Sequence, residues 1–93
     1  SGQGYGVILT DDERHIEYVG AARSGTASGS GAMIIHGPGG NGATYFDGSF
    51  DHGQPDGIVR VVMPGNYPAW RRYENGRDRG RADEADWQPY RFQ

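Results

Sequence analysis

Apolar and polar residues alternate along residues 46–51. Phe46, Gly48 and Phe50 fall on one face of an extended strand, and the polar residues between them fall on the other. A turn-rich sequence follows, and a second predicted strand covers residues 58–63. The pattern predicts a β-hairpin. No segment shows the 3.6-residue period of an amphipathic helix, and residues 83–86 favour at most one helical turn.

The same arrangement recurs along the chain. Three glycine pairs have one internal spacing: Gly25 with Gly29, Gly53 with Gly57, and Gly76 with Gly80. Their first members are 28 and then 23 residues apart, and the excess falls in the turn-rich residues 37–42, where a longer loop is tolerated. Each pair follows a predicted strand, so Gly25, Gly53 and Gly76 are expected to supply the positive φ of hairpin turns.

An aromatic residue and a glycine precede these turns at a spacing of two. Tyr18 stands before Gly20, and Gly48 lies between Phe46 and Phe50. A glycine beside an aromatic on one strand face leaves a slot into which a ring from an adjoining strand can pack. These five residues are therefore expected to form the packing of the repeat. The alternative interpretation is that the aromatics Tyr18, Phe46, Phe50 and Tyr73 line a ligand-binding face.

The repeat resembles the MORN family, whose pattern is an aromatic, one residue, glycine, one residue and an aromatic, then two residues and a glycine, with further glycines four and six positions on. Residues 46–57 match it best, and Val59 replaces the last glycine. The copy from residue 18 has Ala22 for its second aromatic, and the copy from residue 69 has Arg71 for its first glycine.

The resemblance implies an all-β fold, an elongated single-layer antiparallel sheet of successive β-hairpins. It also implies a binding or scaffolding role, with other proteins, copies of the same chain or acidic phospholipids as partners. We expect one domain over residues 1–93, divided into a partial copy at 1–14, copies at about 15–42, 43–65 and 66–82, and a C-terminal cap at 83–93 that covers the open end of the sheet.

Composition supports a thin, folded sheet. Hydrophobic residues make up 34% of the chain and there are 17 glycines, which favours turns over helix bundles. Aromatics make up 12%, more than a disordered segment carries. There are no cysteines, so neither disulfides nor cysteine-ligated zinc are expected, and no apolar run is long enough for a transmembrane segment or signal peptide.

Charge narrows the classes of partner. The net charge of −3 argues against nucleic-acid binding, which needs a basic face. The nine basic residues are all arginine, which indicates a GC-rich coding genome, as in many bacteria, and we expect the chain to be part of a larger bacterial protein.

The third copy carries the strongest charge feature. Its arginines and two neighbouring aromatics are candidate binding residues for a phosphate, a lipid head group or an acidic protein: Arg71, Arg72, Arg77, Arg79, Arg81, Trp70 and Tyr73. Acidic residues are interspersed among them, so a solvated hairpin of mixed charge is the alternative interpretation.

No pattern of catalysis or metal binding accompanies these residues. Asp47, Asp51 and Asp56 lack the glycine spacing of a calcium loop, and the three histidines lack zinc-ligand spacing. No nucleophile motif surrounds any serine, so catalytic residues, metals and cofactors are not expected. The predicted function is a non-enzymatic protein-interaction or self-assembly module. The alternatives are acidic phospholipid or phosphate binding through the arginine-rich hairpin, and an accessory domain of an enzyme.

Overall fold

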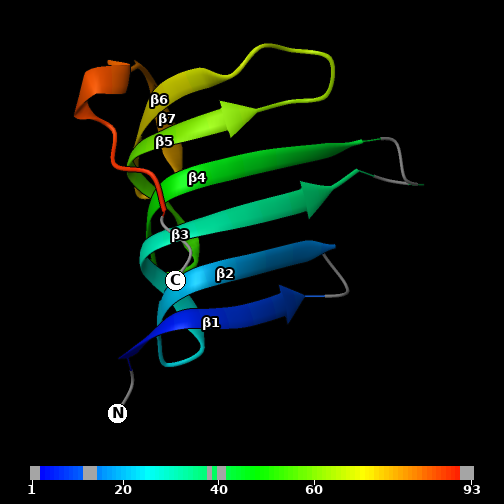
Figure 1. The fold of residues 1–93 in the computed structure, drawn as a ribbon, viewed down its shortest axis with the longest axis vertical. Coiled ribbons are helices and arrows are strands. Elements are labelled where there is room, and N and C mark those ends of the chain that lie inside the picture. The colour runs from blue at the N-terminus through cyan, green and yellow to red at the C-terminus, as the bar shows by residue number, and fades with distance from the viewer. Residues whose placement is uncertain (1–2, 12–14, 38, 40–41, 91–93) are drawn as a thin grey trace.

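The structure is a computed structural model of the 93-residue chain, and it describes residues 3–11, 15–37, 39 and 42–90. Within them, seven strands form one antiparallel sheet, in which their order is their order along the chain (Figure 1). The strands are β1 (Gln3–Asp11), β2 (Ile16–Arg23), β3 (Thr26–His36), β4 (Ala43–Asp51), β5 (Gln54–Val62), β6 (Ala69–Glu74) and β7 (Arg77–Arg81). The prediction of an all-β, single-layer sheet of successive hairpins is confirmed.

Three tight hairpins connect β2 to β3, β4 to β5, and β6 to β7. Each turn has two residues, and both have positive φ: about 52° at the first position and about 80° at the second. Such turns match the right-handed twist of the strands that they join. The turn residues are Ser24 and Gly25, His52 and Gly53, and Asn75 and Gly76. Gly25, Gly53 and Gly76 therefore occupy the second position of each turn.

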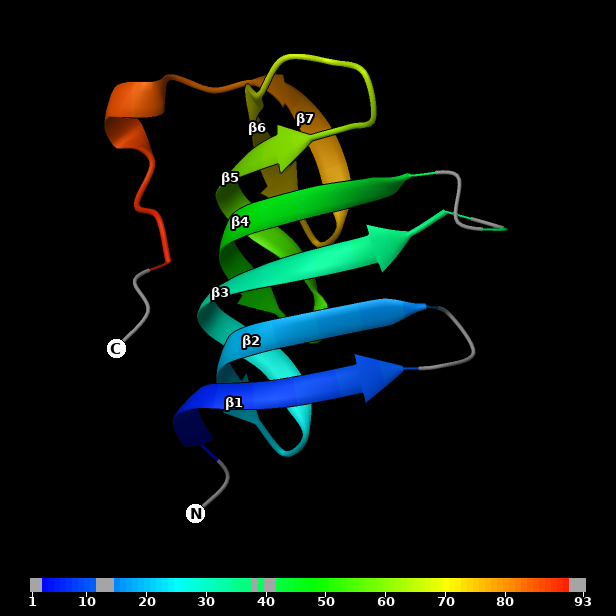
Figure 2. The same cartoon turned by 45° about the vertical axis from the view of Figure 1, so that its right-hand side comes forward.

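The second glycine of each pair lies where the pairing of the strands is irregular. Between Gly20 and Ala22 the register of β2 with β3 shifts, and Gly29, in the extra stretch of β3, has a φ of 109°. The same shift follows Gly48 in the pairing of β4 with β5, next to Gly57. Extra residues on one strand bend it and increase its twist. The strands consequently bend sharply, and the sheet coils on itself (Figure 2).

The inner face of this coiled sheet forms the core. Tyr18, Ala27, Met33 and Phe50 are buried there. The rings of Tyr18 and Phe50 meet edge to face, with their centroids 5.2 Å apart, across the bend. Curling brings distant halves of the strands together, so the molecule measures 37 × 34 × 26 Å.

Glycines line up across the strands at the bend. Gly20 pairs with Gly31, which pairs with Gly48. A Cβ on Gly31 would overlap the ring of Tyr18 from the adjoining strand, whereas a Cβ on Gly48 would lie 2.5 Å from the carbonyl oxygen of Ile58. The slot for a ring therefore exists at Gly31. At Gly48 the glycine instead lets the backbone of β5 approach, which differs from the expected packing of a ring.

The tail after β7 crosses a face of the sheet. It begins with a short 3₁₀ turn, η2 (Glu84–Asp86), at the position where the sequence favoured one helical turn. Trp87 then packs on Trp70 of β6, and Tyr90 donates its backbone N–H to Asp47 of β4. The described tail thus lies on a face of the sheet, whereas the prediction was a cap over the open edge. Residues 91–93 lie outside the described part. An indole gains more burial on an aromatic face than beside the charged strand β7.

Candidate functional site

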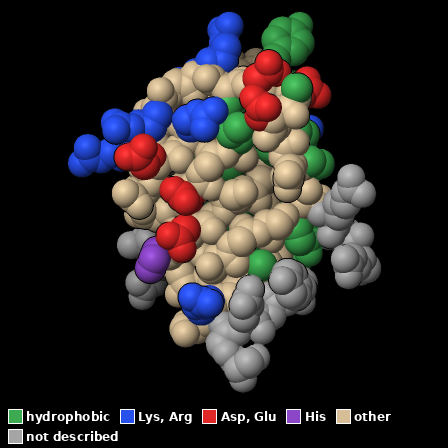
Figure 3. Space-filling view, turned by 90° about the vertical axis from the view of Figure 1, so that its left-hand side faces the viewer, with side chains coloured by type: hydrophobic (Ala, Val, Ile, Leu, Met, Phe, Trp, Pro, Cys, Tyr) green, Lys and Arg blue, Asp and Glu red, His purple; other side chains and the backbone are tan. Residues whose placement is uncertain are grey.

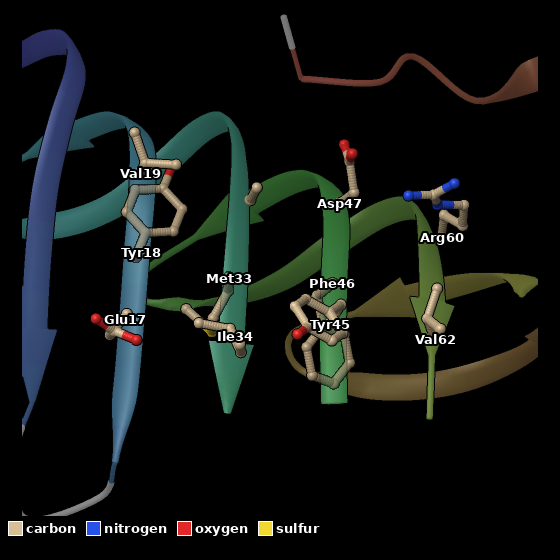
Figure 4. A pocket seen from close by; sticks show the side chains of 11 residues that line it. Glu17, Tyr18, Val19, Met33, Ile34, Tyr45, Phe46, Asp47, Arg60 and Val62 are labelled. Carbon is tan, nitrogen blue, oxygen red and sulfur yellow. The ribbon is translucent and has the colours of Figure 1, made fainter. Parts of the chain in front are cut away.

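The outer face of the sheet carries an open groove of about 530 Å³, which we call the outer-face groove. Alternation along four strands places every second side chain on this face. These side chains come from Glu17, Val19, Ala32, Ile34, Tyr45, Asp47, Arg60 and Val62 (Figure 4). Tyr18, Met33 and Phe46, which lie between them in the sequence, also border the groove, although their side chains pack on the inner face.

Strand register arranges the outward side chains in two rows across β2, β3, β4 and β5. One row contains Glu17, Ile34, Tyr45 and Val62, and the other contains Val19, Ala32, Asp47 and Arg60. Neighbouring strands lie about 4.8 Å apart, so the rows extend roughly 14 Å across the sheet. The lining is mainly aliphatic and aromatic, and Tyr45 is 50% exposed.

Charged groups mark the two ends of the groove. At the β2 end, the carboxylate of Glu17 is 2.7 Å from Nε2 of His36 on β3. At the β5 end is Arg60, whose guanidinium lies over the ring of Trp87 at 5.5 Å from its centroid. Within the described part of the chain, Arg60 forms no ion pair, and its Nε atom is buried without an acceptor. The groove therefore has an engaged anion at one end and an unpaired cation at the other.

The chain's own tail is bound beside the groove. The Trp87 indole N–H donates to the Asp47 carbonyl oxygen at 2.7 Å, and the Tyr90 backbone N–H donates to the Asp47 carboxylate at 2.8 Å. The rings of Trp87 and Trp70 meet at 5.8 Å. Asp47 holds the tail through both its backbone and its side chain.

The candidate arginines of the third copy are divided between the two faces of the hairpin, because Arg71 and Arg72 are adjacent on β6. Arg71 lies in register with Val59 and Gly48, on the inner face, and its Nε contacts both carboxylate oxygens of Asp78 at 3.2 and 3.0 Å. This hydrogen bond lowers the pKa of Asp78 below its ordinary value and raises the pKa of Arg71.

The remaining arginines of this hairpin are spread over its surface. Arg79 is 3.7 Å from Glu74, and no ion pair joins Arg72, Arg77 or Arg81 to a described residue. Figure 3 shows basic and acidic side chains side by side on one flank of the molecule. Mixed charges of this kind are typical of a solvated surface.

The two candidate aromatics of the third copy lie on opposite faces. Trp70 is on the outer face with Trp87, whereas Tyr73 is on the inner face, edge to face with Phe46 at 6.3 Å. Burial raises the pKa of Tyr73. Tyr18, Phe46 and Phe50 likewise belong to the inner packing, and burial raises the pKa of Tyr18 to about 12. The Tyr18 hydroxyl donates to the backbone oxygen of Ala21.

Comparison with family models, curated proteins and solved structures finds no match to this chain.

The described residues contain no group of three or more histidine, cysteine, aspartate or glutamate side chains placed to hold a metal ion. In the part of the chain that the structure describes, no helix has the length and apolar character needed to cross a membrane.

The outer-face groove was not predicted from the sequence. Its signal was present in the outward positions, because Val19, Ile34 and Val62 are apolar where alternation predicts a solvent-facing side chain. Only the strand register shows that these residues become neighbours.

Proposed function

We propose that this chain is a non-enzymatic interaction module that binds a protein partner, a second copy of itself included, through the outer face of its sheet. The observation that carries the proposal is the outer-face groove, which is open and mainly apolar. Exposed apolar surface gathered in one patch is typical of a site of association. The resemblance to MORN repeats, which act as binding and scaffolding modules, points in the same direction.

The architecture accounts for this surface. A single-layer sheet has two faces, and coiling buries only the inner one around Tyr18 and Phe50. The tail covers part of the outer face near Asp47 and Trp70. Tyr45 remains half exposed. A partner seated there would remove apolar surface from water, which favours association.

A matched pair of tyrosine variants tests the proposal. Tyr45 lies in the groove, whereas Tyr67 is 93% exposed in the connection between β5 and β6. We expect Tyr45→Asp to abolish self-association or partner capture, because a carboxylate would stand in the apolar contact, while Tyr67→Asp leaves both unchanged. Size-exclusion chromatography with light scattering measures self-association of each variant. Photocrosslinking from position 45 of the otherwise unaltered chain detects a bound partner. A strictly monomeric protein that crosslinks to nothing, or equal association in both variants, would contradict the proposal.

A further inference from the structure

We infer that the outer-face groove binds an extended peptide segment that crosses β2 to β5 beside the tail and places a carboxylate at Arg60. This inference rests on the proposed function and specifies its ligand.

The tail shows how this face holds a peptide. Trp87 packs its indole on Trp70 and donates to the backbone of Asp47, and Tyr90 follows with a backbone hydrogen bond to the Asp47 side chain. The segment runs across the strands, on the outside of the bend (Figure 1). A second segment in the groove would lie next to this intramolecular interface and extend it toward β2.

The dimensions suit a short stretch of chain. The two rows that border the groove cross four strands, or roughly 14 Å, a distance that about four extended residues span at ~3.3 Å each. In an extended segment every second side chain points the same way. Two such side chains would contact Ile34 and Tyr45, and the volume of about 530 Å³ is of the size that ligand sites have.

Charge sets the chemistry at the β5 end. Arg60 is the cation of the groove, and within the described part of the chain it has neither a carboxylate partner nor an acceptor for its buried Nε atom. Its contact with the Trp87 ring holds the guanidinium in place, while its two terminal NH2 groups remain donors. A carboxylate accepts such groups in a forked, charge-assisted pair.

The two carboxylates that line the groove are already engaged. Asp47 accepts from the tail and Glu17 lies against His36. Figure 4 shows Glu17 and Arg60 at opposite ends of the groove. Glu17 repels a partner's carboxylate at the β2 end, and Arg60, whose cross-strand neighbour is the tail-bound Asp47, attracts it at the β5 end. This difference gives the bound segment a direction.

Selection from a phage-displayed library of random heptapeptides supplies the probes. We expect selection on the whole chain, with counter-selection on Tyr45→Asp, to enrich apolar sequences that carry Asp, Glu or a free C-terminal carboxylate. The enriched peptides are then synthesised, and their dissociation constants are measured by fluorescence anisotropy. Replacing the peptide's acidic residue by its amide and capping its C-terminus separately show which of the two carboxylates is bound.

Protein variants then test the partner of that carboxylate. Arg60→Gln is expected to raise the dissociation constant at least tenfold, because it removes a charge-assisted pair next to apolar surface. Arg72→Gln on β6, an exposed arginine outside the groove, is the matched control and is expected to change nothing. The peptide with its acidic group amidated should lose as much affinity on the unaltered protein, so the result does not depend on how Arg60→Gln folds.

The outcomes separate this inference from the proposed function. Failure to enrich any peptide, enriched peptides without a carboxylate, or equal binding by Arg60→Gln and Arg72→Gln overturns the peptide site. If association with a folded partner is still lost in Tyr45→Asp, the interaction module stands while its peptide ligand does not.

Discussion

The third hairpin, β6–β7, has the same kind of turn as the first two full hairpins, β2–β3 and β4–β5. It differs from them in the packing of its inner face. All three have two-residue turns with positive φ at both positions. Yet the cross-strand row that contains Gly20, Gly31 and Gly48 continues through Val59 to Arg71 and Arg81. Every buried hydrophobic side chain that the structure describes belongs to β2, β3, β4 or β5.

This difference shows that turn chemistry and core packing are separable. In the first two hairpins a glycine gives room to a ring or to a neighbouring backbone, and the inner face is buried. In the third hairpin an ion pair between Arg71 and Asp78 occupies the equivalent part of the inner face. On the outer face of the third hairpin, Trp87 of the tail packs on Trp70. The third hairpin is therefore stabilised by polar contacts and by the tail, and it contributes less to the core.

The largest expected effect compares the core tyrosine of each region. Tyr18→Ala should lower the free energy of unfolding by about 3–5 kcal/mol, because it removes a buried ring that meets Phe50 and leaves a cavity. Tyr73→Ala should cost clearly less, since Tyr73 is only partly buried. Urea denaturation followed by circular dichroism measures both. Equal losses would mean that the third hairpin shares the core after all.

The free energy of unfolding should fall at alkaline pH because of Tyr18, which belongs to the core of the first two hairpins. Burial raises the pKa of Tyr18 from 10.0 to about 12, so the folded protein keeps a proton that the unfolded chain releases above pH 10. The associated stability is complete below pH 10 and is lost as the pH rises to about 12, up to ~3 kcal/mol. Unfolding measured between pH 9 and 12 should show this loss in the natural protein, and Tyr18→Phe should flatten it. An unchanged alkaline slope in Tyr18→Phe would assign the loss elsewhere.

The smallest expected effect concerns the ion pair of the third hairpin. The pKa of Asp78 is lowered by its hydrogen bond with Arg71, so the contribution of this carboxylate is present above its unfolded pKa, near 3.8, and is lost as the pH falls below it. Because both side chains are more than a third exposed, the change should be small. Asp78→Asn should remove a small acid-dependent part of stability below pH 4, with Glu74→Gln as a control. A large loss at neutral pH would give the pair a greater role.

Local patterns made much of the fold predictable. Alternation at Phe46, Gly48 and Phe50 predicted a strand with one buried face, and the spacing of the glycine pairs predicted the hairpins. Both signals act over a few residues, where backbone conformation follows from residue type. The inward placement of Tyr18 and Phe50 follows from the same alternation.

The candidate site was less predictable because it depends on contacts between distant residues. The arginines of the third hairpin are close in sequence, but alternation sends Arg71 and Arg72 to opposite faces, and Asp78 already engages Arg71. Conversely, Arg60 and Glu17 are 43 residues apart in the sequence but line the same groove. The tail's position on Asp47 joins residues about 40 positions apart, which no local signal marks.

By itself, the sequence determined which residues turn the chain and which face of the strand around Phe46, Gly48 and Phe50 is buried, because glycine geometry and side-chain alternation are local properties. Only the tertiary structure decided how far the sheet coils, which glycine receives the Tyr18 ring and which face the tail covers. Those outcomes depend on strand register and on competition between surfaces for the same aromatic side chains. The tail covers only part of the outer face, so the groove that Arg60 lines stays open.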